Sequence, residues 1–270
     1  MPRTLWLECG TVAAARVHLM DQHTLLLAAV PVIGIVAGFI NTLAGSGSLL
    51  TLPLLILLGL PANVANGTNR VGVTMQNIAA VATFRRHGAL PLAGSWKLIV
   101  PSVVGGIVGA MLAVDLDERL LRKTIAVLMI VLITVMLLKP ERWLAARVGP
   151  RQPRLLVEVP VFFAIGVYGG FLQVSVGLFL LVALVLAAGF EIVGANAMKN
   201  LIVLLFTAAA LLVFVFNDQV EWTLGLLLGA GQSVGGWAAA HFAVKRGAEF
   251  VRWAVIVISV ISAVALFAGL

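Results

Sequence analysis

The sequence is poor in charge and contains a single cysteine. Only 11% of its 270 residues are Asp, Glu, Lys or Arg, while 61% are hydrophobic. Soluble domains carry about twice that share of charge, so the chain is predicted to be an integral membrane protein. Cys9 is the one cysteine, which excludes an internal disulfide and a cysteine-based metal site. Neither a metal nor another cofactor is predicted.

The few charges are unequally divided. There are 18 Lys and Arg against 11 Asp and Glu, which gives a net charge of +7. In a soluble protein such an excess would indicate nucleic acid as a partner. Here the basic residues lie in short connections beside apolar runs, where they set membrane topology. The predicted partner is therefore the lipid bilayer and not nucleic acid.

The chain begins with a predicted extramembrane leader, residues 1–23, which is a poor match to a cleaved signal peptide because the following apolar run is too long. From Thr24 to Asn69 there is no charged residue. As one helix this stretch would measure about 69 Å, more than twice the roughly 30 Å hydrocarbon core. The chain must turn back, and glycines within residues 41–48 mark the break. Two arrangements stay open: a full helix followed by a short one, or a re-entrant hairpin.

The remaining apolar runs divide into two groups on either side of a basic linker, residues 139–156, which is predicted to be cytoplasmic. The runs lie at about 71–84, 97–114, 120–138, 157–176, 178–190, 198–216, 222–244 and 252–269. We therefore expect an all-α polytopic membrane protein with about 8–10 segments, short ones included. Its first membrane repeat would be residues 24–138 and its second residues 157–270.

The two halves resemble each other. At a constant shift of 130 positions the second half repeats Ala65-Asn66 as Ala195-Asn196. The other matches at this shift are Gly59 with Gly189, Phe84 with Phe214, Gly105-Gly106 with Gly235-Gly236, and Arg122 with Arg252. Gly38-Phe39 recurs at a shift of 132 as Gly170-Phe171. Such agreement indicates an internal repeat. Equivalent loops carry opposite charge: Arg85-Arg86 against Asp218 and Glu221, for example. By the positive-inside rule the repeats are predicted to be inverted, with both termini outside.

Inverted repeats with glycine-broken segments are typical of secondary transporters, which bind solutes between the broken helices. The polar residues next to the breaks are Asn41, Thr42, Ser46, Ser48, Gln173 and Ser175, and the glycines Gly45 and Gly47 of the first break are predicted to belong to the same site. A second set places a cation and amides at the predicted start of the third segment of each half. It consists of Asn66, Thr68, Asn69 and Arg70 in the first half, with Gln76 and Asn77 further along, and of Lys199 and Asn200 in the second. A cation at a helix N-terminus favours an anion, so these residues are predicted to bind an anionic substrate.

These residues carry a family resemblance. The run from Gly38 to Ser48, then Gly59-Leu60-Pro61 and Ala65-Asn66-Gly67-Thr68-Asn69-Arg70, resembles the first-repeat signature of the sulfite exporter TauE/SafE family, also called toluene sulfonate uptake permeases. The resemblance covers nearly the whole chain from about residue 25. It implies a carrier of the bacterial inner membrane for small organosulfur or carboxylate anions such as sulfite, sulfoacetate or sulfonates. We expect a multi-pass protein that works by alternating access of a site between the two breaks and that is not an enzyme. An anion channel and a carrier of small carboxylates are the alternatives.

Three further sequence features receive other interpretations. His241 lies among Ala and Phe in an apolar run, where a packed histidine is expected rather than a proton relay. A serine protease using Ser46 and His241 is disfavoured, because the spacing fixes no contact between them. The glycines Gly105, Gly106, Gly109, Gly235 and Gly236 are assigned to close helix packing, and the same surface could serve a homodimer.

Overall fold

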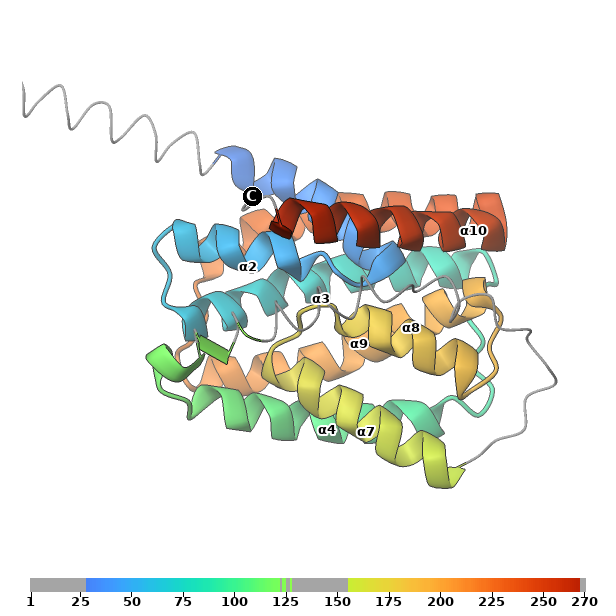
Figure 1. Ribbon diagram of the computed structural model, residues 1–270, viewed down its shortest axis with the longest axis horizontal. Helices are drawn as coiled ribbons and strands as arrows, with labels where there is room; N and C mark the ends of the chain where they lie inside the picture. The colour runs from blue at the N-terminus through green and yellow to red at the C-terminus, as the bar shows by residue number, and fades with distance from the viewer. Residues whose placement is uncertain (1–27, 122, 125–126, 128–154, 268–270) are drawn as a thin grey trace, which may run out of the picture.

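The computed structural model describes residues 28–121, 123, 124, 127 and 155–267, and all regular secondary structure in these ranges is helical (Figure 1). The helical fold class is therefore confirmed. The leader 1–23, Cys9, most of the run 120–138 and residues 139–154 of the linker lie outside the described residues. Two described helices, Trp96–Val114 and Ile192–Phe216, are long and apolar enough by themselves to cross a membrane.

The first glycine-rich break joins two antiparallel helices. The helix Ala28–Ala44 ends where Gly45 adopts a left-handed φ of +77°, and α2 (Ser48–Leu57) then runs back beside it. A Cβ atom added to Gly47 would lie 2.2 Å from the carbonyl oxygen of Ala37, which shows how tightly the chain returns. Both arrangements that the sequence left open contain this turn between a longer and a shorter helix. We call this pair the first hairpin.

A second hairpin is formed by α7 (Leu155–Phe171) and α8 (Val176–Leu186). The predicted run 157–176 is interrupted after Phe171, and in the connection Gln173 and Ser175 adopt left-handed φ angles of 55° and 54°. The Tyr168 hydroxyl donates to the carbonyl oxygen of Val174 at 2.6 Å and holds the turn. Figure 1 shows α2 and α8 extending in opposite directions from the middle of the molecule.

Each hairpin is followed by a helix of 25 residues, α3 (Ala62–Arg86) and α9 (Ile192–Phe216). The sequence predicted later starts, at about 71 and 198, and those predictions are wrong. The predicted starts were too late because the polar residues before each apolar run were interpreted as the boundary of the helix. The polar run 66–70 instead lies inside α3, where its side chains are buried and bonded within the protein.

Two further helices complete the described fold. The helix α4 spans Trp96–Val114, and α10 spans Trp222–Phe267 with a sharp kink at Gly247, whose φ is 74° and ψ is −165°. The two predicted runs 222–244 and 252–269 are the two sides of this kink. Figure 1 shows the C-terminal part of α10 lying alongside its first part.

The fourth helix of each half packs with the other half. α4 lies against α7 and α9, whereas α10 lies against α3. Glycines permit these contacts: a Cβ atom on Gly105 would lie 2.3 Å from the Phe163 carbonyl oxygen, and one on Gly235 would lie 2.0 Å from that of Ile35. The predicted packing role of these glycines is confirmed. We call the helix Ala28–Ala44, α2, α3 and α10 the first packing unit, and α4, α7, α8 and α9 the second packing unit.

Within each packing unit the main helices run parallel. Along α10, Gly225 lies against Val71 and Gly229 lies against Met75, so α10 and α3 run in the same direction. Along α4, Gly105 lies against Phe163 and Gly109 against Phe171. α3 and α9, one from each unit, run antiparallel, because Gly67 near the start of α3 meets Phe214 near the end of α9. The two units are therefore oppositely directed.

Charges of opposite sign predominate at the two ends of this bundle. The end where α3 finishes and α10 kinks carries Arg85, Arg86, Lys245 and Arg246, together with the acidic Glu191 and Glu249. The opposite end, where α4 and α9 finish, carries Asp115, Asp117, Glu118, Asp218 and Glu221, together with the basic Arg119 and Lys123.

Candidate substrate site

The tips of the two hairpins touch in the interior of the protein. A Cβ atom added to Gly45 would lie 2.3 Å from the Cα atom of Gly177, and one added to Gly177 would lie 2.5 Å from the Cα atom of Gly45. Only two glycines let the two backbones approach so closely. The segments that the sequence marked as broken helices therefore meet at one point, although more than a hundred positions separate them.

A small cavity lies beside this crossing. Its volume is about 10 Å³ for the centre of a water-sized sphere, which is about the space that one water molecule needs. It is lined by both hairpins and by α3 and α9, through Asn41, Gly45, Asn77, Gln173, Val176, Gly177, Lys199, Asn200 and Val203. Four amides and one ammonium group, all of buried residues, thus line a water-sized space.

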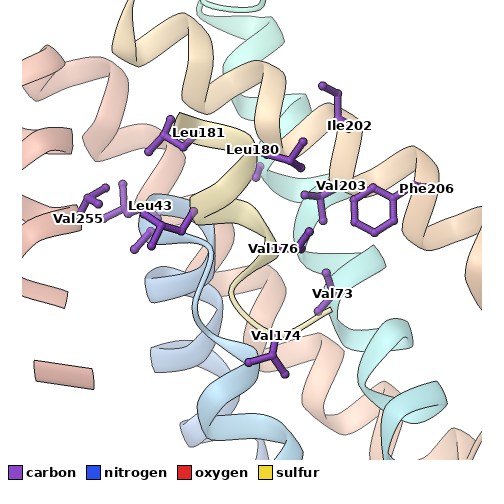
Figure 2. Close-up of a cluster of buried hydrophobic side chains, with 14 of the residues drawn as sticks. Leu43, Val73, Val174, Val176, Leu180, Leu181, Ile202, Val203, Phe206 and Val255 are labelled. Carbon is purple, nitrogen blue, oxygen red and sulfur yellow. The ribbon is translucent and has the colours of Figure 1, made fainter. Parts of the chain in front are cut away.

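Apolar side chains surround this polar centre. Figure 2 shows Leu43 from the end of the helix Ala28–Ala44 and Val174 from the connection between α7 and α8, with Val73, Val203 and Phe206 from the long helices nearby. All five are at most 4% exposed. Because such a shell excludes water, charges inside it interact more strongly than they would at a surface.

Lys199 extends from α9 to the end of the broken helix in the other packing unit. Its Nζ atom donates to the carbonyl oxygens of Asn41, Thr42 and Leu43 at 3.3, 2.6 and 3.3 Å. The neighbouring Asn200 donates through Nδ2 to the Thr42 carbonyl at 3.2 Å. These carbonyls belong to the last turn of the helix Ala28–Ala44, where helical N–H partners run out, although the Asn41 carbonyl also accepts from the backbone N–H of Gly45 at 2.8 Å. Lys199 therefore caps the negative end of that helix.

Arg70 makes the reciprocal contact from α3 to the end of α7. Its guanidinium donates to the carbonyl oxygen of Gly169 at 3.3 Å and to that of Gly170. It also lies 4.6 Å from the centre of the Phe214 ring. Asn66, one turn before Arg70, donates to the Phe171 carbonyl at 2.8 Å. Each broken helix is thus capped by a cation and an amide of the opposite packing unit.

The structure corrects the reason for which both cations were predicted. Neither lies at a helix N-terminus, because α3 begins at Ala62 and α9 begins at Ile192. The partners of both cations are instead C-terminal carbonyl groups of α7 and the helix Ala28–Ala44. A buried cation is most stable near such a negative helix end, and the sequence does not show which helix end reaches it.

Amide and hydroxyl groups connect each hairpin tip to the long helix behind it. Asn41 donates to Gln76 Oε1 at 3.0 Å, and Gln76 donates in turn to Thr42 Oγ1 at 3.0 Å. In the second half Gln173 donates to Thr207 Oγ1 at 2.7 Å. These bonds fix both connections against α3 and α9, so the polar groups at the tips are held in place.

A further buried network anchors α2 to α3. Thr51 donates to Asn69 Oδ1 at 2.6 Å, and Asn69 donates to Ser48 Oγ at 3.2 Å. Thr68 accepts from the backbone N–H of Glu221 at 2.8 Å and so ties α3 to the start of α10. These predicted site residues hold helices together and do not line the cavity.

The predicted site residues are therefore divided by the structure. Six of them line the cavity: Asn41, Gly45, Asn77, Gln173, Lys199 and Asn200. The others lie behind it, at the tips or in the networks above: Thr42, Ser46, Gly47, Ser48, Asn66, Thr68, Asn69, Arg70, Gln76 and Ser175. Ser46 and Ser175 are buried at the tips, and neither hydroxyl has a partner among the described residues.

Sequence reasoning missed three residues of the cavity wall, Val176, Gly177 and Val203. Gly177 had a usable signal, because it follows Gly45 by 132 positions, the same shift that relates the two Gly-Phe pairs. The two valines carry no signal, since they are apolar residues in apolar runs.

His241 and the described acidic residues supply no second site. The His241 ring lies 5.5 Å from that of His87 and 6.1 Å from that of Trp237, which are centroid distances. The interpretation of a packed histidine is thus supported, and these contacts lie at the end of α3, not at the hairpin tip that holds Ser46. Among the residues that the structure describes, no three His, Cys, Asp or Glu side chains form a group suited to a metal.

Comparison with known proteins agrees with this architecture. The chain matches the family Sulfite exporter TauE/SafE over residues 30–266. It is 29% identical over 245 residues to the probable membrane transporter protein ORF9 of a Sinorhizobium species, covering 90% of this chain and 93% of that protein. It is 28% identical over 240 residues to a probable membrane transporter protein of Haemophilus influenzae, covering 89% and 94%.

A third relative is the probable membrane transporter protein YfcA of Escherichia coli K12, with 29% identity over 238 residues and 88% of each chain covered. No solved structure matches the chain at a significant level. The family match spans most of the sequence and includes both hairpins and both long helices. The chain therefore belongs to the sulfite exporter TauE/SafE family and is a membrane transporter.

Proposed function

We propose that this transporter moves small organosulfur anions, namely sulfite, sulfoacetate or a sulfonate, across the bacterial inner membrane by alternating access. The observation that carries the proposal is the cavity at the hairpin crossing. One ammonium group, that of Lys199, lines it together with the amides of Asn41, Asn77, Gln173 and Asn200. A sulfur oxyanion needs a compensating charge and several hydrogen-bond donors, and this set provides both.

The size of the cavity supports a carrier that opens and closes. A space of about 10 Å³ holds about one water molecule, whereas sulfite has four heavy atoms. We infer that the structure is a closed state and that the hairpin tips separate to admit the anion. On binding, the anion would accept one or more of the hydrogen bonds that the Lys199 ammonium now donates to the carbonyl groups of the helix Ala28–Ala44.

The inverted repeat is part of the same proposal. Equal lengths of α3 and α9, their antiparallel course and the reciprocal capping by Lys199 and Arg70 all support it. Since equivalent loops then lie on opposite sides, the basic end of the bundle would face the cytoplasm. The hairpins would enter the membrane from opposite sides and meet near its middle, as in other carriers with broken helices.

The moving parts in this mechanism are the packing units. α4 is bound to α7 and α9, and α10 is bound to α3, so the two sequence halves are interlocked and cannot rock as separate bodies. The hairpin tips and the caps of Lys199 and Arg70 lie at the contact between the packing units. Opening would therefore separate the first packing unit from the second at this point.

Countertransport in proteoliposomes tests the proposal. Purified protein would be reconstituted in vesicles loaded with unlabelled sulfite, sulfoacetate or a small carboxylate, and uptake of the labelled anion would be followed. A carrier of organosulfur anions gives saturable uptake that is accelerated by the same anion inside. If only carboxylates inside the vesicles accelerate uptake, the protein would be a carrier of small carboxylates instead. Single-channel currents without countertransport would identify an anion channel and contradict the proposal.

A further inference from the structure

The two cations at the hairpin tips occupy an unusual position for positively charged side chains. Lys199 and Arg70 are at most 1% exposed, and their partners are neutral oxygens: carbonyl groups and, for Arg70, also the Asn66 amide at 3.5 Å. A buried cation without a carboxylate partner is costly unless other groups stabilise its charge. Here the stabilising groups are the last-turn carbonyl groups and the dipoles of two interrupted helices.

The Lys199 contact has the composition of a cation site. Three consecutive carbonyl oxygens, those of Asn41, Thr42 and Leu43, converge on one Nζ atom within 3.3 Å. An ammonium has three donors and no acceptor, so each proton has an oxygen to meet. In carriers with broken helices, unwound carbonyls and C-terminal helix ends of this kind coordinate the coupling Na⁺ or proton. In this protein the position is filled by a side chain.

Arg70 fills the corresponding position in the other hairpin. Its guanidinium binds the carbonyls of Gly169 and Gly170 at the end of α7. Each cation comes from the opposite packing unit, so the two contacts cross between the units in reciprocal fashion. A free metal ion would have to be bound from solution at each cycle, whereas a tethered cation is always present.

We infer that Lys199 and Arg70 are tethered substitutes for coupling cations, so that transport does not require Na⁺ at the two helix ends. It follows that removal of the Lys199 ammonium exposes a site for a monovalent cation, formed by the carbonyl oxygens of Asn41, Thr42 and Leu43. The first statement rests on the proposed transport function. The second concerns the protein alone and can be tested without any substrate.

The test is the thermal stability of purified protein in NaCl, KCl, methylammonium chloride and N-methylglucamine chloride at equal ionic strength. The variants are Lys199→Ala, which leaves space for an ion, and Lys199→Met, whose uncharged side chain fills that space. Lys245→Ala removes an exposed lysine and is the matched control. We expect Lys199→Ala to unfold about 3 °C higher in Na⁺ or methylammonium than in N-methylglucamine, because a bound ion stabilises the folded state. The wild type, Lys199→Met and Lys245→Ala should unfold at the same temperature in all four salts.

Equal unfolding temperatures of Lys199→Ala in all four salts would overturn the inference, and so would failure to obtain folded Lys199→Ala in any of them. In vesicles, wild-type flux should be equal with Na⁺ or N-methylglucamine in the medium, and flux that needs Na⁺ would also contradict it. If no organosulfur anion is transported while cations still rescue Lys199→Ala, the proposed function fails and the cation site stands. If the wild type transports organosulfur anions but no cation stabilises Lys199→Ala, the proposed function stands and the cation site fails.

Discussion

Gly45 and Gly177 touch through their backbones where the two hairpins cross, with no room for a side chain on either residue. This contact joins two segments of similar sequence and places the polar cavity beside it. The stability of the crossing and the closed shape of the cavity therefore depend on the same two residues.

Replacement of Gly45 by Ala should strongly destabilise the protein. The new Cβ would lie 2.3 Å from Gly177 Cα, and the φ of +77° adds about 1–2 kcal/mol for a non-glycine residue. With about 1–3 kcal/mol more for overpacking, a large fall in unfolding temperature or loss of folded protein is expected. Gly59→Ala is the matched control, since Gly59 has a φ of +94° and no atom within 4 Å of the added Cβ. Equal effects of the two substitutions would contradict the crossing.

Arg70→Lys should weaken the cap on α7 although the charge is kept. The guanidinium binds two successive carbonyls, those of Gly169 and Gly170, and an ammonium cannot reproduce this fork. The loss of one charged hydrogen bond costs about 1.5–3 kcal/mol. Thermal unfolding of Arg70→Lys and of Arg85→Lys, which changes an exposed arginine, measures the difference. An unchanged unfolding temperature for Arg70→Lys would show that the forked contact with both carbonyls contributes nothing beyond the charge itself.

Two buried glutamines should respond in opposite ways to replacement by Met. Gln76 bonds both Asn41 and Thr42, so Gln76→Met should cost about 2 kcal/mol. Neither amide atom of the buried Gln232 has a partner among the described residues, so Gln232→Met should be neutral or stabilising. The two unfolding temperatures are compared directly. A loss at Gln232 as large as that at Gln76 would mean that Gln232 has a bonding role.

The two sequence halves should not fold separately. α4 lies against α7 and α9, so a fragment cut in the linker 139–156 leaves the glycine face of α4 without its partner helices. We expect each fragment alone to be degraded or aggregated, and both to accumulate and co-purify when they are expressed together. Yield after membrane extraction and pull-down through a tag on one fragment give the measurement. A stable, monodisperse single half would refute the interlocked arrangement.

Much of the fold follows from local sequence signals. Glycine and small polar residues in 41–48 mark the first break, and Gly247 ends the first part of α10 between two predicted apolar runs. The starts of α3 and α9 were misplaced because hydropathy treats a buried Asn or Arg like one in water. Whether a polar residue ends a helix or remains inside it depends on tertiary partners such as the Phe171 carbonyl for Asn66.

The site was only partly readable for the same reason. Six cavity residues were predicted from their place beside the breaks or in the polar runs that follow. The direction in which the Lys199 side chain points could not be predicted, since its partners at Asn41 to Leu43 lie more than 150 positions away in the sequence. The exchange of α4 and α10 between halves was also hidden, because similarity between repeats shows which helices correspond and not which helices pack together.

The most direct test of the account is anion binding to Asn77→Asp. Asn77 lines the cavity, and its Oδ1 atom has no partner among the described residues, so a carboxylate there would face the bound anion. Asn217→Asp makes the same change at an exposed site and is the control. Equilibrium binding of labelled sulfite and sulfoacetate to purified protein should be at least about tenfold weaker for Asn77→Asp than for the wild type, through like-charge repulsion. It should be unchanged for Asn217→Asp. Wild-type affinity in a folded Asn77→Asp protein would contradict the placement of the substrate at the hairpin crossing.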